Sequence, residues 1–210
     1  MPSATSNEDP ATIPFSRGYR WLAGGLLVVN CWWWMQILHE LGHVLAALFF
    51  RATINAVILP PLAFSRTDVG PSEQADLILW AGPVLGSLIP LWLATLAIRF
   101  RWNFWAELRF FAGFALIANG AYLTAGGWLN MGDGGSLRGL GGSPLAMSLW
   151  GIIGVAVDLA LWHRLGPFFG FGREATIVSP RRVWWYTLGT GATLFVQAAN
   201  ASLTLLNHAP

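Results

Sequence analysis

The sequence contains no lysine, only one cysteine and few charges of either sign. Its 12 basic residues are all arginine, and charged residues make up 10% of the 210 positions, compared with about 25% in a typical soluble domain. A single cysteine, Cys31, excludes an intramolecular disulfide and a multi-cysteine metal site. The formal net charge is only +2 and provides no dense basic patch, so we expect no nucleic acid partner.

Apolar side chains, in contrast, are abundant. Hydrophobic residues make up 55% of the chain and the mean hydropathy is +0.53. A soluble protein of this length must cover a large surface with polar groups, and this composition cannot do so. We therefore expect a multi-pass integral membrane protein in a lipid bilayer. Its fold should be all-α, because backbone groups in lipid must be satisfied within each span.

Five hydrophobic stretches are long enough to span a bilayer, which takes roughly 20 residues. They cover about 21–50, 77–98, 110–132, 144–163 and 183–207, and they form a single transmembrane domain, 21–210, after a polar tail at residues 1–20. Residues 52–59 are rich in β-branched side chains and end at a proline pair, which predicts a strand or short β-hairpin against the bundle. The glycine-rich residues 129–143 predict a turn.

The arginines predict how the spans are oriented. With five spans, 9 arginines fall on the side of the N-terminus and 3 on the other side. The positive-inside rule then places the N-terminus in the cytoplasm, and we expect a bacterial cytoplasmic membrane. Asp158, near the end of the fourth stretch and close to His163 and Arg164, is expected to form a structural ion pair or to snorkel towards the membrane surface.

One polar cluster, His39-Glu40-Leu41-Gly42-His43, interrupts the first hydrophobic stretch. On a helix the two histidines lie about 40° apart and one turn apart, so both imidazoles can hold one Zn²⁺ ion. That ion then needs a third protein ligand and a water, whose proton Glu40 is placed to accept. A charge at membrane depth costs on the order of 3 kcal/mol by insertion scales, which argues against a functionless cluster.

The third zinc ligand should lie on the same side of the membrane as this cluster. The carboxylates on that side are Asp68, Glu73, Asp76 and Asp133. Asp133 is set among glycines that allow close backbone approach, so we expect it to be the ligand. Asp76 is the alternative, although its charge could instead stabilise the N-terminus of the second span.

These motifs resemble the site-2 protease family of intramembrane zinc metalloproteases. The resemblance covers roughly residues 30–140 and rests on the His39–His43 cluster, Ala81-Gly82-Pro83 and Asp133-Gly134-Gly135. It implies a three-helix core in which His39, His43 and Asp133 bind zinc and Glu40 is the catalytic base.

The chain departs from the family's downstream motif, which usually has Asn, then Pro, then Leu-Asp-Gly. Gly132 replaces the leucine, and no proline lies between Asn119 and Asp133. Asn119 and Asn130 are both candidates for the family's asparagine, with a role in positioning substrate or stabilising an oxyanion. For Asn119, a helix–helix hydrogen bond is an equally good interpretation.

Two functions follow as hypotheses. The first is a hydrolase, a zinc metalloendopeptidase that cleaves membrane-embedded protein substrates, with residues 52–59 holding the unwound substrate by strand addition. The alternative is a metal-binding, protease-like structural subunit of a larger membrane protein complex. The altered Asn/Pro motif and the 13 tryptophans favour this alternative.

Overall fold

The structure is a computed structural model that describes residues 17–172 and 179–207. Most of the predicted polar tail, residues 1–20, lies outside the described residues. In chain order the elements are α1 (Arg17–Phe49), β1 (Ile54–Ile58), β2 (Arg66–Val69), α2 (Ala75–Arg99), α3 (Trp105–Leu129), α4 (Gly132–Gly139), α5 (Pro144–Trp162), the 3-10 turn η1 (Gly166–Phe169) and α6 (Pro180–Asn207).

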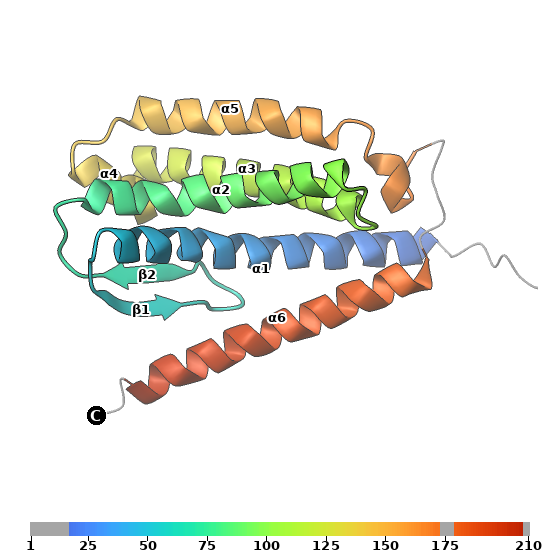
Figure 1. Ribbon diagram of the computed structural model, residues 1–210, viewed down its shortest axis with the longest axis horizontal. Coiled ribbons are helices and arrows are strands. Elements are labelled where there is room, and N and C mark those ends of the chain that lie inside the picture. The colour runs from blue at the N-terminus through green and yellow to red at the C-terminus, as the bar shows by residue number, and fades with distance from the viewer. Residues whose placement is uncertain (1–16, 173–178, 208–210) are drawn as a thin grey trace, which may run out of the picture.

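Four of the described helices, α1, α2, α3 and α5, are long and apolar enough to cross a membrane. They coincide with the first four predicted spans, so the prediction of an all-α polytopic fold is confirmed. The predicted fifth span, 183–207, lies within α6, a helix of 28 residues that begins near the N-terminal end of α1 and diverges from it, so that the hairpin lies between the two helices at the other end (Figure 1). Among the described residues, α6 is not one of the four helices that meet the length and hydropathy criteria.

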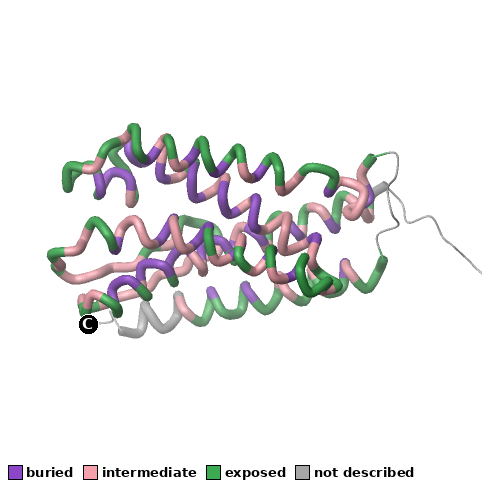
Figure 2. The backbone as a smooth tube through the Cα atoms, turned by 45° about the horizontal axis from the view of Figure 1, so that its top comes forward, coloured by how far each residue is buried: buried purple, intermediate pink, exposed green. Residues whose placement is uncertain are grey.

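Small residues allow the helix backbones to approach closely. A Cβ atom at Gly42 of α1 would overlap the carbonyl of Ala81 in α2, and one at Gly120 of α3 would lie 2.9 Å from the Cα of Gly151 in α5. Such contacts provide the close van der Waals packing that holds helices together in lipid. Buried positions accordingly gather where helices face one another, whereas much of the outer surface of α5 is exposed (Figure 2).

The two strands form an antiparallel hairpin beside the C-terminal half of α1 (Figure 1). Val69 of β2 packs against the buried cluster of Ala46, Ala47 and Ile78, which joins the hairpin to α1 and α2. On its other side, β1 is bonded to α6. The side chain of Asn200 accepts a hydrogen bond from the Leu59 N–H (2.9 Å) and donates one to the Val57 carbonyl (3.0 Å).

The glycine-rich segment after α3 is not a simple turn, so that prediction is wrong. Residues 132–139 form the short helix α4. A Cβ atom at Gly134 would overlap the backbone of Gly127 in α3, and one at Gly135 would lie 2.5 Å from the carbonyl carbon of Asn130. The glycines therefore serve close packing of α4 on α3, which sequence patterns do not distinguish from turn formation.

The ion pair expected for Asp158 is not formed. Its side chain is fully buried in α5, and neither carboxylate oxygen has a hydrogen-bond partner among the described residues. It packs instead against Gly113 of α3, where a Cβ atom would overlap its Oδ1.

Candidate metal centre

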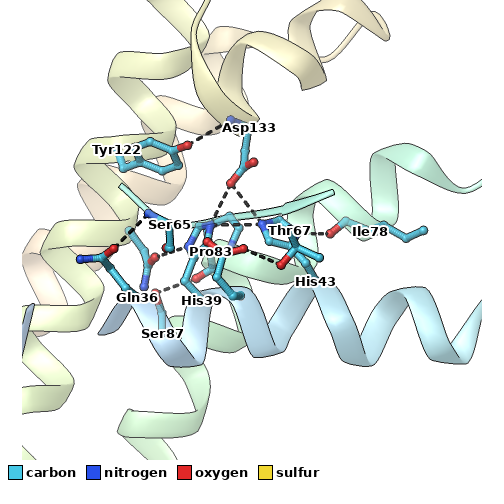
Figure 3. Close-up of polar contacts among 12 residues, drawn as sticks. Gln36, His39, His43, Ser65, Thr67, Ile78, Pro83, Ser87, Tyr122 and Asp133 are labelled. Carbon is cyan, nitrogen blue, oxygen red and sulfur yellow. Dashed lines mark hydrogen bonds and ion pairs between the residues drawn. The ribbon is translucent and has the colours of Figure 1, made fainter. Parts of the chain in front are cut away.

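Two elements distant in sequence bring the candidate ligands together. Helix α1 carries His39 and His43 one turn apart on its buried face, and α4 presents Asp133 in its first turn. His39 Nε2 lies 2.8 Å from Asp133 Oδ2, His43 Nε2 lies 3.3 Å from the same oxygen, and the two nitrogens are 3.1 Å apart (Figure 3). Three potential ligand atoms therefore converge on one point.

The spacing of these atoms fits a metal ion. Tetrahedral zinc with bonds near 2.0–2.1 Å separates its ligand atoms by roughly 3.4 Å, close to the 2.8, 3.1 and 3.3 Å of this triangle. Two imidazoles and a carboxylate also suit other first-row transition metals. The group of His39, His43 and Asp133 could thus hold a metal ion.

The Nδ1 nitrogen of each histidine, which faces away from the convergence point, is hydrogen-bonded to an oxygen acceptor. Nδ1 of His39 donates to Asn119 Oδ1 (2.7 Å), and Nδ1 of His43 donates to the Ile78 carbonyl (2.8 Å). Because these bonds keep a proton on Nδ1, loss of the Nε2 proton would leave each Nε2 with a lone pair directed at the common point, as in metal-binding histidines. Asn119 is 1% exposed, and its hydrogen bond therefore fixes the orientation of the His39 ring.

Asp133 is held in place by its backbone as well as by the histidines. Its N–H donates to the hydroxyl of Tyr122 in α3 (3.4 Å). Burial alone would raise the pKa of its carboxyl group, but hydrogen bonds and charge from His39 and His43 outweigh burial and hold that pKa well below its usual range. The carboxylate is consequently ionised, which is the form that binds a metal.

The structure brings Asp133, and not Asp76, to the histidines. Asp76 lies in the first turn of α2, where its charge suits the helix N-terminus, and it is not part of the described ligand group. Asn130 is exposed at the C-terminal end of α3, in the left-handed conformation with φ 60°. Of the two candidate asparagines, Asn119 alone is hydrogen-bonded to a candidate ligand in the part of the chain that the structure describes.

Glu40 lies next to His39 and is 2% exposed. Its Oε2 atom accepts a short hydrogen bond of 2.6 Å from the hydroxyl of Thr67 in β2. The sequence motif includes Glu40 but gives no sign of Thr67, which lies 27 residues away in a segment without a motif. The hairpin thus contacts the candidate base directly.

Two hollows flank the candidate ligands. We call the first the inner cavity: it measures about 40 Å³, borders His39 and Glu40, and is walled by Trp32, Phe64 and Tyr122. The second, which we call the groove, measures about 360 Å³ and borders His43 and Asp133. Its lining comes from β2 and the residue after it, from the first turns of α2 and from α4. These residues are Thr67 to Gly70, then Ala75, Ile78 and Leu79, and then Asp133 and Ser136.

Comparisons with protein-family models, with curated proteins and with solved structures found no match to this chain.

Proposed function

We propose that this chain is an intramembrane zinc metallopeptidase in which His39, His43 and Asp133 hold the metal. The observation that supports this most strongly is the convergence of three ligand atoms beside a buried glutamate, among helices that can cross a membrane. Zinc in such a site supplies a Lewis acid and lowers the pKa of a water molecule towards neutrality. Peptide hydrolysis needs this combination of a polarised carbonyl, an activated water and a base.

In this proposal Glu40 is the general base and later the general acid. The hydroxyl of Thr67 donates to Oε2 and fixes the orientation of the carboxylate. Oε1 is then the atom that takes a proton from the attacking water and returns it to the leaving amine. Burial of Glu40 excludes bulk water, which strengthens its electrostatic interactions with the reacting groups.

The substrate would bind as an extended strand. A transmembrane helix hides its amides within its own hydrogen bonds, so it must be unwound locally before cleavage, and strand addition can hold the unwound segment. The sequence predicts this role for residues 52–59, but β1 lies between β2 and Asn200 of α6. The strand beside the groove is β2, and we assign the role to its free edge.

The remaining parts of the proposal concern location and partners. The arginine distribution supports an N-terminus in the cytoplasm, and the membrane we propose is a bacterial cytoplasmic membrane. The partner would be a membrane-embedded protein whose backbone enters the groove between β2 and α4.

The decisive experiment compares Glu40→Gln with the wild-type chain in proteoliposomes that contain a set of single-span test segments, with products identified by mass spectrometry. Glu40→Gln should keep its zinc but lose cleavage, because an amide cannot accept the proton. Glu73→Gln is the matched control, since Glu73 is exposed in the loop before α2 and should leave cleavage unchanged. Persistent cleavage by Glu40→Gln would show that Glu40 is not the base.

The same experiment separates the enzyme from the structural subunit. If the zinc-loaded wild-type chain cuts no segment, and if cells carrying Glu40→Gln grow like wild type but cells carrying His39→Ala do not, the metal serves a structural role in a complex.

A further inference from the structure

The inner cavity and the groove follow one another along a single stretch of chain. Phe64 and Ser65, which immediately precede β2, line the inner cavity, and Thr67 to Gly70 line the groove. His39 borders the first hollow and His43 borders the second. An extended peptide beside β2 would therefore place side chains in both hollows, with the metal ligands between them.

Aromatic rings make the inner cavity small. Phe64 stacks on Tyr122 of α3 with centroids 5.8 Å apart, and it meets Trp32 of α1 edge to face at 5.7 Å. The resulting space of about 40 Å³ is a few times the roughly 10–15 Å³ that one water molecule requires. It has room for a methyl or hydroxymethyl group, whereas an isobutyl or benzyl group would displace a ring.

The inner cavity also carries hydrogen-bond donors without an acceptor. Gln36 and Asn119 both border it, and they are 2% and 1% exposed. Gln36 Oε1 accepts the Ser65 N–H (3.0 Å) and Asn119 Oδ1 is bonded to His39, but Gln36 Nε2 and Asn119 Nδ2 have no partner among the described residues. Buried amide donors are rarely left unpaired, so they suit a ligand that brings a carbonyl oxygen.

We propose that the inner cavity is the subsite for the residue that follows the scissile bond, and that it selects glycine, alanine or serine there. The proposal rests on the proposed peptidase function. Antiparallel pairing with β2, the commoner and more stable arrangement, directs the C-terminal part of the peptide towards Phe64 and Ser65. Gln36 is the positioning residue, because its free amide N–H donates to a carbonyl of the bound peptide.

The test uses binding rather than turnover. Four peptide hydroxamates differ only in the side chain that follows the hydroxamate: hydrogen, methyl, isobutyl or benzyl. Each is titrated against the cobalt-substituted full-length chain in detergent, and the change in cobalt absorption reports binding at the metal. The methyl probe should bind about tenfold or more tightly than the isobutyl and benzyl probes.

Variants of the loop before β2 locate the selectivity. Phe64→Ala removes one wall of the inner cavity and should bring the affinities of the isobutyl and benzyl probes to within about threefold of the methyl probe. Leu62→Ala is the matched control, because Leu62 is 94% exposed on the same loop, and it should keep the wild-type preference. Gln36→Leu should weaken the four probes by the same factor, about tenfold, because it removes a backbone contact.

The outcomes distinguish the subsite from the function. Equal affinities for the methyl and isobutyl probes, or an unchanged preference in Phe64→Ala, would overturn the subsite. A normal cobalt signal in the same titrations would show that the metal site is still present. Unchanged affinities in Gln36→Leu would overturn the role of Gln36. A chain that takes up no cobalt would overturn the proposed function, and the subsite with it.

Discussion

The imidazole of His39 is fixed by a side chain from a different helix. Asn119 of α3 accepts its Nδ1 proton at 2.7 Å, which turns Nε2 towards Asp133. Partners of this kind raise the basicity of a ligand and hold its orientation, and their loss typically costs about 10–100-fold in metal affinity.

Asn119→Leu should therefore lower zinc affinity by roughly 10–100-fold without abolishing binding. Competition with a chromophoric chelator measures this directly. Asn130→Gly is the control, because glycine suits the φ of 60° at that exposed position and should leave the affinity unchanged. An equal loss in both variants would contradict the assignment of Asn119 as the partner of His39.

Asp133→Ala should have a larger effect, since it removes one of the three proposed ligands. We expect zinc affinity to fall by orders of magnitude. Asp76→Ala should keep its zinc and lose about 1 kcal/mol or less of stability. Asp76 lies in the first turn of α2, where its charge stabilises only the helix N-terminus. Equilibrium dialysis against buffered zinc distinguishes the two, and zinc retained by Asp133→Ala would mean that another group completes the site.

At the scale of single residues, the sequence predicts the part of the site that lies on one helix. His39, Glu40 and His43 lie within five consecutive residues, so helix geometry alone relates them. The hydrogen bond from His39 to Asn119 joins residues 80 positions apart, and the bond from Thr67 to Glu40 joins residues 27 apart. Contacts of that range depend on how helices and hairpin pack, which local patterns do not record.

Among the elements, α1 and α2 cross more closely than ordinary side chains would allow. Gly42 lies against the Ala81 carbonyl, and Gly82 lies against the ring of His43. Because the overlap at Gly82 involves a candidate ligand, the distance between these helices and the geometry of the site depend on each other.

Gly82→Ala should therefore displace His43 and lower both zinc affinity, by more than about tenfold, and thermal stability in detergent. Gly25→Ala is the matched control in α1, since a Cβ atom there would meet nothing within 4 Å. It should leave zinc binding unchanged and raise stability by up to about 1 kcal/mol through helix propensity. Zinc titration and thermal unfolding test both variants, and a zinc affinity in Gly82→Ala equal to that in Gly25→Ala would contradict the expected displacement.

The hairpin gives a second prediction for the elements. Asn200→Ala removes the hydrogen bonds from its side chain to Val57 of β1 and to Leu59 just after it, so the amide of Leu59 should lose its acceptor. Hydrogen exchange followed by mass spectrometry should show faster exchange in peptides that cover residues 54–59. Peptides from the buried part of α3 should be unaffected, and uniform acceleration along the chain would instead indicate global destabilisation.

Hydropathy predicts the long helices well, because each span must be apolar over about 20 residues. It predicts α4 and β2 poorly. The first is a short glycine-rich helix packed on α3, and the second has a polar sequence, Arg66–Val69, whose position is set by β1 and α1.

In the molecule as a whole, α6 extends beside α1 towards the end of the bundle that carries the hairpin (Figure 1). If α6 also crosses the membrane, the ends of the chain lie on opposite sides. We expect that arrangement, because residues 183–207 carry no charged side chain over a length sufficient to cross a bilayer. Reporter fusions before Met1 and after Pro210 check it, and reporters on the same side would mean that α6 lies along the membrane surface.

The glycine contacts between α1 and α2 also bear on how related chains can diverge. Gly42 belongs to the cluster of candidate metal ligands and Gly82 to a separate motif 40 positions later. Enlarging Gly42 would push against the backbone of α2, and enlarging Gly82 would push against the ring of His43. Substitutions at the two positions should therefore be linked in evolution. Distant relatives that keep the site should keep glycine at both positions, even where the surrounding apolar residues have been exchanged freely, and a chain that has lost either glycine should have lost the histidine pair as well.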